Sequence, residues 1–234
     1  MEPIPTPSQS KSTLRTSILI FGGFCIAYNL GTALHELGHA IATWLTGGTV
    51  YSISLNPFAW SWTSLDGGED SSPLFIAWGG VLFGVLFSAL AAGIATLYRR
   101  PWLSPLYLLG GCALASNGIY LAVAAFADVG DAGNLIQLGV PRFCVVGLGG
   151  LLLLLSCLWM SLIQPRIGIA PATSFRQRLF TLHLGVTPYL IAMLVYARLF
   201  NPEEIWMWVG YTGLGFVAVT ATATFGHLLR NGNT

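Results

Sequence analysis

The sequence predicts an all-α polytopic membrane protein, with about six transmembrane helices and a short β-hairpin between the first two helices. Of its 234 residues, 54% are hydrophobic and only 8% are charged, whereas a soluble domain carries roughly 25% charged residues. Six apolar runs each approach or exceed the ~20 residues that a membrane-spanning helix needs. These runs cover residues 17–45, 74–97, 106–126, 143–162, 179–199 and 205–229.

The first sixteen residues differ from the rest in composition. They are rich in Pro, Ser and Thr and contain Lys11 and Arg15, so we expect a polar, disordered tail over residues 1–16. No internal repeat and no Gly/Ser-rich linker interrupts the remaining chain. We therefore expect one membrane domain, in which residues 17–141 form a three-helix core with the hairpin and residues 142–234 add three further spanning helices.

Basic residues indicate the orientation of this domain. If six helices alternate in direction, most basic residues fall on one side of the membrane: Lys11, Arg15, Arg99, Arg100, Arg166, Arg176, Arg178 and Arg230. Arg142 and Arg198 fall on the other side. The positive-inside rule then predicts that both termini are cytoplasmic. A net charge of +1 leaves no basic surface for a nucleic acid, so we expect the lipid bilayer to be the large partner.

The hairpin is predicted over residues 50–63, between the first two apolar runs. Apolar and polar residues alternate on both sides of a turn at Asn56-Pro57, with Tyr51, Ile53 and Leu55 before it and Phe58, Trp60 and Trp62 after it. Two interpretations remain open. The segment is either an interfacial loop whose tryptophans lie at the headgroup level or a strand that contacts a substrate.

A metal-binding motif lies inside the first apolar run, at His35-Glu36-Leu37-Gly38-His39. Histidines four residues apart lie on one face of a helix, so both imidazoles can bind one ion, and Glu36 beside them can act as a general base. On a soluble helix the pattern could arise by chance. At membrane depth each ionisable residue is costly, and three within five positions indicate a functional site.

A catalytic zinc site normally has three protein ligands and leaves one position for water. After the motif the carboxylates are few: Asp66, Glu69, Asp70, Asp128, Asp131, Glu203 and Glu204. In an alternating bundle the first and third helices run in the same direction. Asp128 and Asp131, just beyond the third helix, are therefore level with the motif and are the candidates for the third ligand. Asp66 could approach only if the hairpin folds back into the membrane.

The chain resembles the site-2 protease family of intramembrane metallopeptidases, in particular its small bacterial-type branch. The resemblance rests on His35-Glu-Leu-Gly-His39-Ala, the glycines after the hairpin, Gly79-Gly80, and Gly130-Asp131-Ala-Gly-Asn-Leu135 running on to Gly139-Val-Pro141. It implies that residues 17–141 are the catalytic core and that Asp131 completes the zinc site, with Asp128 in reserve. The family's Leu-Asp-Gly-Gly pattern occurs here only at 65–68, in the hairpin. The resemblance also implies a site near the cytoplasm, whereas the basic residues place it nearer the opposite face.

The expected function is that of an intramembrane zinc metallopeptidase. It would hydrolyse peptide bonds in or near transmembrane segments of membrane proteins, with one zinc per chain held by His35, His39 and Asp131 and with Glu36 as the general base. If the hairpin contacts the substrate, the substrate would bind by adding a strand to residues 50–63. The alternative is a zinc-binding polytopic membrane protein without peptidase activity, such as a scaffold or a transporter.

Other motifs narrow the choice of function. Membrane gluzincins take a glutamate on a later helix as third ligand, and no later apolar run contains a central glutamate. Di-iron enzymes need several histidine boxes, and only His183 and His227 remain. Gly80-x-x-x-Gly84 is typical of helix packing. Asn117 either donates a hydrogen bond to a substrate carbonyl or forms a packing hydrogen bond between helices.

Overall fold

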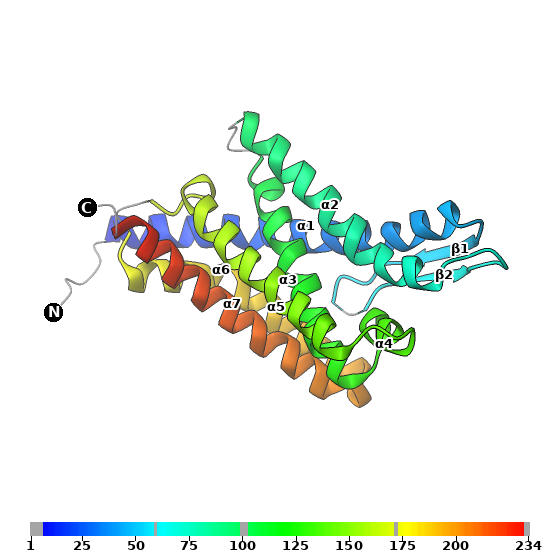
Figure 1. The fold of residues 1–234 in the computed structure, drawn as a ribbon. Coiled ribbons are helices and arrows are strands. Elements are labelled where there is room, and N and C mark those ends of the chain that lie inside the picture. The colour runs from blue at the N-terminus through cyan, green and yellow to red at the C-terminus, as the bar shows by residue number, and fades with distance from the viewer. Residues whose placement is uncertain (1–6, 59, 99–102, 171–172, 232–234) are drawn as a thin grey trace.

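The computed structural model describes residues 7–58, 60–98, 103–170 and 173–231 (Figure 1). Its elements follow the chain as a long first helix, a two-stranded hairpin and then further helices. They are α1 (Pro7–Leu45), β1 (Thr49–Ser54), β2 (Trp62–Asp66), α2 (Pro73–Tyr98), α3 (Ser104–Ala127), α4 (Gly130–Gln137), α5 (Arg142–Ile163), the 3₁₀ turn η2 (Gln164–Ile167), α6 (Phe175–Phe200), the 3₁₀ turn η3 (Pro202–Glu204) and α7 (Ile205–Asn231).

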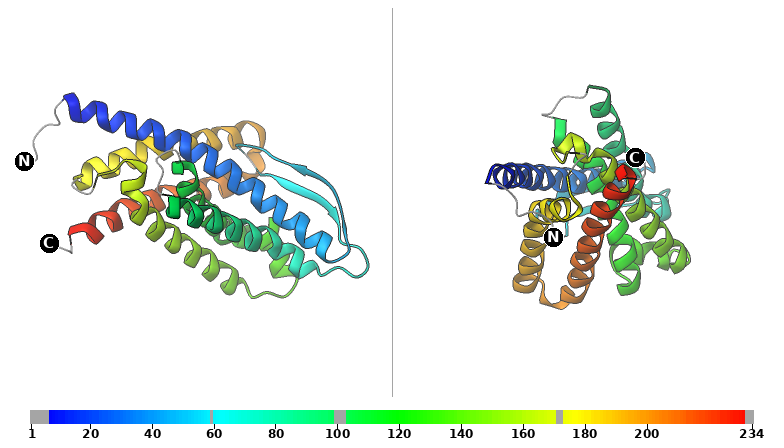
Figure 2. Two further views of the ribbon diagram at one scale, coloured as in Figure 1. Left: turned by 90° about the horizontal axis from the view of Figure 1, so that it is seen from above. Right: turned by 90° about the vertical axis from the view of Figure 1, so that its left-hand side faces the viewer.

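Six of the described helices are long and apolar enough to cross a membrane, and the chain is a multi-pass membrane protein. The spans cover Ser12–Leu45, Pro73–Tyr98, Pro105–Ala127, Arg142–Ile167, Phe175–Phe200 and Pro202–Arg230. The predicted fold class is confirmed, including the antiparallel hairpin between the first two spans. The start of α1 and the end of α7 lie at one end of the bundle (Figures 1 and 2), called here the proximal end. The base of the hairpin and α4 lie at the opposite, distal end.

The first helix begins earlier than predicted. Residues 7–16 are helical in α1, which corrects the expectation of a disordered tail over residues 1–16; residues 1–6 lie outside the described part of the chain. Pro7 is compatible with the first turn of a helix, and no glycine or proline follows before Ser17. Tertiary contacts hold this extension, because Gln177 on α6 donates a hydrogen bond to Thr13 Oγ1 (2.8 Å).

Helix α3 occupies the centre of the bundle. It packs against α1, α2, α5 and α7, and its contact with α5 is the most extensive between any two elements of the described chain. At this crossing a Cβ on Gly118 would lie 2.7 Å from the Gly149 carbonyl oxygen, so the two backbones approach as closely as small residues allow. Helix α3 thus holds its side chains in fixed positions relative to α1.

The hairpin runs from the distal end back towards the middle of the bundle (Figure 1). Its strands pair from Thr49 with Asp66 to Ser54 with Trp62, with a bulge between Val50 and Ser52. The turn beyond them packs on helices: Tyr189 on α6 donates a hydrogen bond to the Pro57 carbonyl. Non-helical backbone is stable at membrane depth only where protein or a cavity surrounds it, and these contacts supply that cover.

Candidate metal centre

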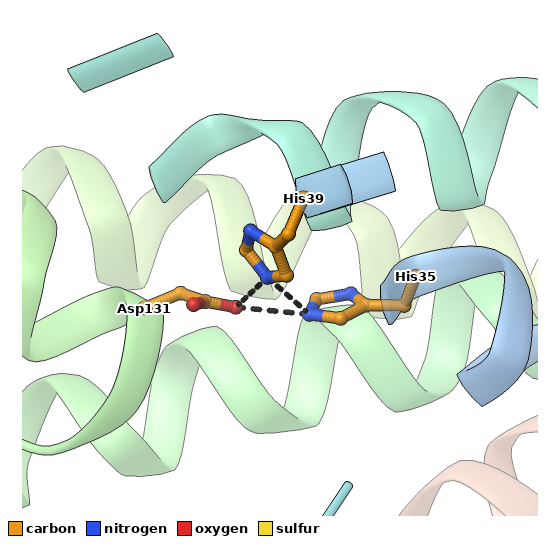
Figure 3. A group of neighbouring side chains, drawn as sticks. All are labelled: His35, His39 and Asp131. Carbon is orange, nitrogen blue, oxygen red and sulfur yellow. Dashed lines mark hydrogen bonds and ion pairs between the residues drawn. The ribbon is translucent and has the colours of Figure 1, made fainter. Parts of the chain in front are cut away.

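His35, His39 and Asp131 converge on one point between α1 and α4 (Figure 3). The Nε2 atoms of the two imidazoles lie 3.2 Å apart, and Asp131 Oδ2 lies 2.9 Å from His35 Nε2 and 3.2 Å from His39 Nε2. The three side chains are only 13%, 10% and 14% exposed. The structure therefore brings together the three residues that the sequence and its resemblance single out, in a site with little access to water.

The outer nitrogen of each imidazole is held by a hydrogen bond that fixes its protonation. His39 Nδ1–H donates to the Ile76 carbonyl on α2 (2.8 Å), which can only accept. His35 Nδ1–H donates to Asn117 Oδ1 (2.8 Å), because the Asn117 amide nitrogen is itself engaged in donating to the Ala113 carbonyl. In a neutral imidazole the other nitrogen, Nε2, then carries a lone pair.

Three electron-pair donors consequently face each other: two Nε2 lone pairs and one carboxylate oxygen. They need a positive charge between them. An additional proton would serve two of the three atoms, whereas a divalent cation serves all of them. Zinc bonds of about 2.0–2.1 Å in tetrahedral geometry separate neighbouring ligand atoms by roughly 3.3 Å. The observed separations are close to this, so the donor set fits zinc in both chemistry and spacing.

Gly80 on α2 leaves the space that such an ion requires. A Cβ at this position would lie 2.5 Å from the Nε2 atoms of both His35 and His39. Gly84, one turn further along α2, packs against the backbone of His35, where a Cβ would lie 3.0 Å from the Cα. The predicted role of these two glycines in helix packing is confirmed, and Gly80 also leaves the Nε2 side of both imidazoles open.

The turn between α3 and α4 separates the two candidate aspartates. Asp128, with φ 52°, ends α3 and directs its carboxylate outwards to Arg142 (2.6 Å). Asp131 lies in the first turn of α4 and faces the histidines. Of the two candidate aspartates, Asp131 is therefore the one that lies beside the histidines, and Asp128 is held away from them.

Asp66 remains outside the centre although the hairpin folds back. It stands at the distal base of the hairpin, where its Oδ1 accepts a hydrogen bond from the Gly68 backbone (3.1 Å). The hairpin residue that reaches the site is Thr63, whose hydroxyl lies 2.8 Å from Glu36 Oε2 and 3.0 Å from the Glu36 carbonyl oxygen. Glu36 itself is only 5% exposed, and the motif's acidic side chain is thus held by β2.

A cavity of about 750 Å³ surrounds these residues. Its walls come from α1, β2, α2, α3, α4 and α7, and it extends from Tyr28 deep in the bundle to Gln137 at the distal end. His35, Glu36, His39 and Asp131 all line it. The size is within the range of pockets that bind small molecules or peptide segments, so a ligand can reach both the metal-binding atoms and Glu36.

Several residues at the site escape prediction from sequence. Thr63, Tyr120 and the Ile76 carbonyl carry no motif, and Asn117 is identified by sequence only as one of two alternatives. The structure gives Asn117 a hydrogen bond between helices, to His35. His183 lies apart from the site and contacts Thr187 and Thr220 (3.1 and 3.2 Å), while His227 packs beside the ring of Phe175. Neither joins the cluster.

Comparison with known proteins gives one result about the family. A family model described as Peptidase M50B-like matches residues 15–126, which include the motif, the hairpin and α2 and most of α3. Curated proteins and solved structures give no match. Asp131 lies just beyond the matched segment, beside the histidines that lie within it. Residues 15–126 are similar to the M50B-like peptidases, and this match confirms the resemblance of the chain to the site-2 protease family.

Proposed function

We propose that this protein is an intramembrane zinc metallopeptidase. The observation that carries the proposal is the convergence of two imidazole lone pairs and one carboxylate beside Glu36, inside a cavity of a membrane bundle. His35, His39 and Asp131 would hold one zinc per chain. Zinc with two neutral histidines, Asp131 and ionised Glu36 sums to no net charge, which is the combination that a site of low dielectric tolerates best.

The chemistry would divide between the metal and Glu36. When bound, zinc supplies Lewis acidity, which activates water and polarises a peptide carbonyl. Glu36 lines the same cavity and would accept the proton of the attacking water and then pass it to the leaving amine. Asn117 and the Ile76 carbonyl hold the imidazoles in the tautomer that ligation requires.

The substrate would be a membrane protein cleaved in or near a transmembrane segment. A helical peptide bond is shielded by its own hydrogen bonds, so the segment must become extended before hydrolysis. The two-stranded hairpin borders the cavity through Trp62, Thr63 and Leu65 and could receive an extended segment as an added strand. This retains the expectation that residues 50–63 bind the substrate.

The orientation we propose has both termini in the cytoplasm. Among the described residues, Arg15, Arg166, Arg176, Arg178 and Arg230 belong to helix ends and turns at the proximal end, and Arg142 and Arg198 to helix ends at the distal end. Arg99 and Arg100 lie outside the described residues. The asymmetry supports a cytoplasmic proximal end, which would direct the cavity towards the opposite side of the membrane.

The decisive experiment uses the substitution Glu36→Gln, which keeps size and removes basicity. We expect the variant to contain about one zinc per chain by elemental analysis and to lose nearly all turnover. A His35→Ala, His39→Ala variant that still inserts in membranes should lose the zinc as well. Glu69→Gln, an exposed change outside the cavity, is the matched control and should behave as the parent.

Activity would be read in cells that express each protein. Membrane-anchored species that accumulate uncut with Glu36→Gln, but not with Glu69→Gln, are the candidate substrates, to be tested with purified enzyme. Equal processing of a bound physiological substrate by parent and Glu36→Gln protein would reject the peptidase activity. A zinc-binding membrane protein without peptidase activity, a scaffold or a transporter, would then be the better account.

A further inference from the structure

We infer that Tyr120 is a positioning residue for the metal centre, and that it acts through Asp131. The inference rests on the proposed metal site and adds a residue that no motif identifies. Tyr120 lies on α3, beside the first turn of α4, and lines the same cavity. Its hydroxyl oxygen accepts a hydrogen bond from the backbone N–H of Asp131 (3.0 Å).

This hydrogen bond replaces a missing helix cap. The first N–H groups of a helix have no partner within it, and the residue before α4, Val129, has no side chain that could accept from them. Tyr120 supplies an acceptor from the preceding helix to the residue that faces the histidines. The position of the Asp131 carboxylate therefore depends on a hydroxyl that does not itself touch the ligand atoms.

Gly130 makes this approach possible. Its φ of 56° is unfavourable for residues with a side chain, and a Cβ there would overlap the Tyr120 hydroxyl oxygen. Gly130 and Asp131 therefore act together. Gly130 has no side chain and leaves room for the Tyr120 hydroxyl, while Asp131 donates its backbone N–H to that hydroxyl and directs its carboxylate towards the histidines. Either a methyl group at position 130 or the loss of the hydroxyl would disturb the same contact.

The ring of Tyr120 is itself fixed on two sides. It meets the His35 imidazole edge-on (centroids 6.2 Å apart, planes at 84°) and packs on the Trp60 indole (5.2 Å). Trp60 stacks on Trp208 (4.3 Å) and donates from Nε1 to Glu204 (2.7 Å). The hydroxyl is therefore held by the turn of the hairpin and by α7, and it transmits that rigid placement to α4.

The test measures zinc affinity by competition with a chromophoric chelator, in purified full-length protein. Tyr120→Phe removes one oxygen and keeps the ring contacts. Losing an outer partner of a metal ligand typically weakens metal binding about 10- to 100-fold, and we expect a loss of that size. Tyr107→Phe is the matched control on the same helix: Tyr107 is more deeply buried than Tyr120 and donates to the Ala95 carbonyl (2.9 Å), outside the cavity. It should leave zinc affinity unchanged.

A double-mutant cycle separates positioning from general packing. In an Asp131→Asn background, Tyr120→Phe should cause no further loss of affinity, because the residue through which it acts is already altered. Equal losses in both backgrounds, or wild-type affinity in Tyr120→Phe, would overturn the inference. Absence of zinc binding in the parent would instead reject the proposed metal site. Should Tyr120→Phe not fold, Gly130→Ala replaces it in the same cycle, with the same expected dependence on Asp131.

Discussion

Thr63 connects the hairpin to the acidic residue of the metal motif. Its hydroxyl is placed to donate to Glu36 Oε2, and one carboxylate oxygen of Glu36 is thereby fixed in direction. A general base must be held at a defined angle to the water that it deprotonates, since misplacement by even an ångström is costly for catalysis. If a substrate adds a strand to the hairpin as proposed, it would lie beside Thr63, which is hydrogen-bonded to the proposed general base Glu36.

Substitution of Thr63 tests this connection. Thr63→Val keeps the shape and removes the donor, so we expect kcat to fall by roughly tenfold or more, consistent with a lost hydrogen bond to a charged group. Thr63→Ser restores the hydroxyl and should recover most of the rate. Both variants should contain the parent's zinc, because Thr63 does not contact His35, His39 or Asp131. Turnover of Thr63→Val at the parent's rate would show that the hydroxyl has no role in positioning Glu36.

The sequence predicts the metal-binding residues of the site better than the residues that hold them in place. His35, Glu36 and His39 are readable because their spacing is local and a helix converts it directly into a shared face. Asp131 follows from the resemblance and from the parallel direction of the first and third helices. Thr63 and Tyr120 could not be predicted, because their roles depend on the register of the hairpin and on the turn between α3 and α4, which no local pattern encodes.

Helix α2 contributes backbone and empty space rather than ligands. Its Ile76 carbonyl accepts from His39, and Gly80 keeps both metal-side nitrogens clear. The crossing with α1 is equally tight at Gly79, where a Cβ would lie 2.7 Å from the Gly38 carbonyl oxygen. The close packing at Gly79 and Gly80 therefore sets the distance between α2 and the metal motif on α1. Larger side chains at these two positions would force the two helices apart.

Gly80→Ala tests the space on α2. The methyl group would occupy the volume beside both Nε2 atoms, so we expect zinc content to fall below half of the parent's while the protein still inserts in membranes. Gly93→Ala on the same helix is the matched control: nothing lies within 4 Å of a Cβ there, and Ala should be neutral or slightly stabilising in a helix. Full zinc content in Gly80→Ala protein would contradict the role assigned to this glycine.

Elements were predicted better than their ends. Long apolar runs identify the six spans because lipid tolerates little else at that length. The start of α1 could not be placed, because residues 7–16 are polar and their helix is held by tertiary contacts such as that between Gln177 and Thr13. The short helix α4 was missed as an element, since eight residues with two glycines carry no clear helical signal.

Over the whole molecule the charges are divided between the two ends. Every Asp and Glu of the described residues lies in the distal part of α1, in the distal loops or at the adjoining starts of α4 and α7. Most described basic residues lie at the proximal end. The molecule therefore has an acidic distal end and a basic proximal end, an arrangement that the order of residues along the chain predicts once six crossings are assumed.

Cysteine labelling tests the orientation. In a background without the four native cysteines, Asp70→Cys at the distal end and Ala170→Cys at the proximal end are both exposed in the structure. With intact cells and a membrane-impermeant maleimide, we expect modification of position 70 alone, and modification of position 170 only after permeabilisation. The reverse pattern would place the termini outside and bring the cavity to the cytoplasmic face.

The centre also joins parts of the chain that are remote in sequence. Asp131 and His39 are 92 positions apart, and the segment between them contains the hairpin, α2 and α3. A bound ion would act as a reversible cross-link that closes this long loop, and such a link reduces the conformational entropy of the unfolded chain. Bound zinc would then stabilise the fold by linking α1 to α4, in addition to its proposed role in catalysis. If zinc is bound as proposed, its withdrawal would remove this link and leave the protein more easily unfolded and degraded.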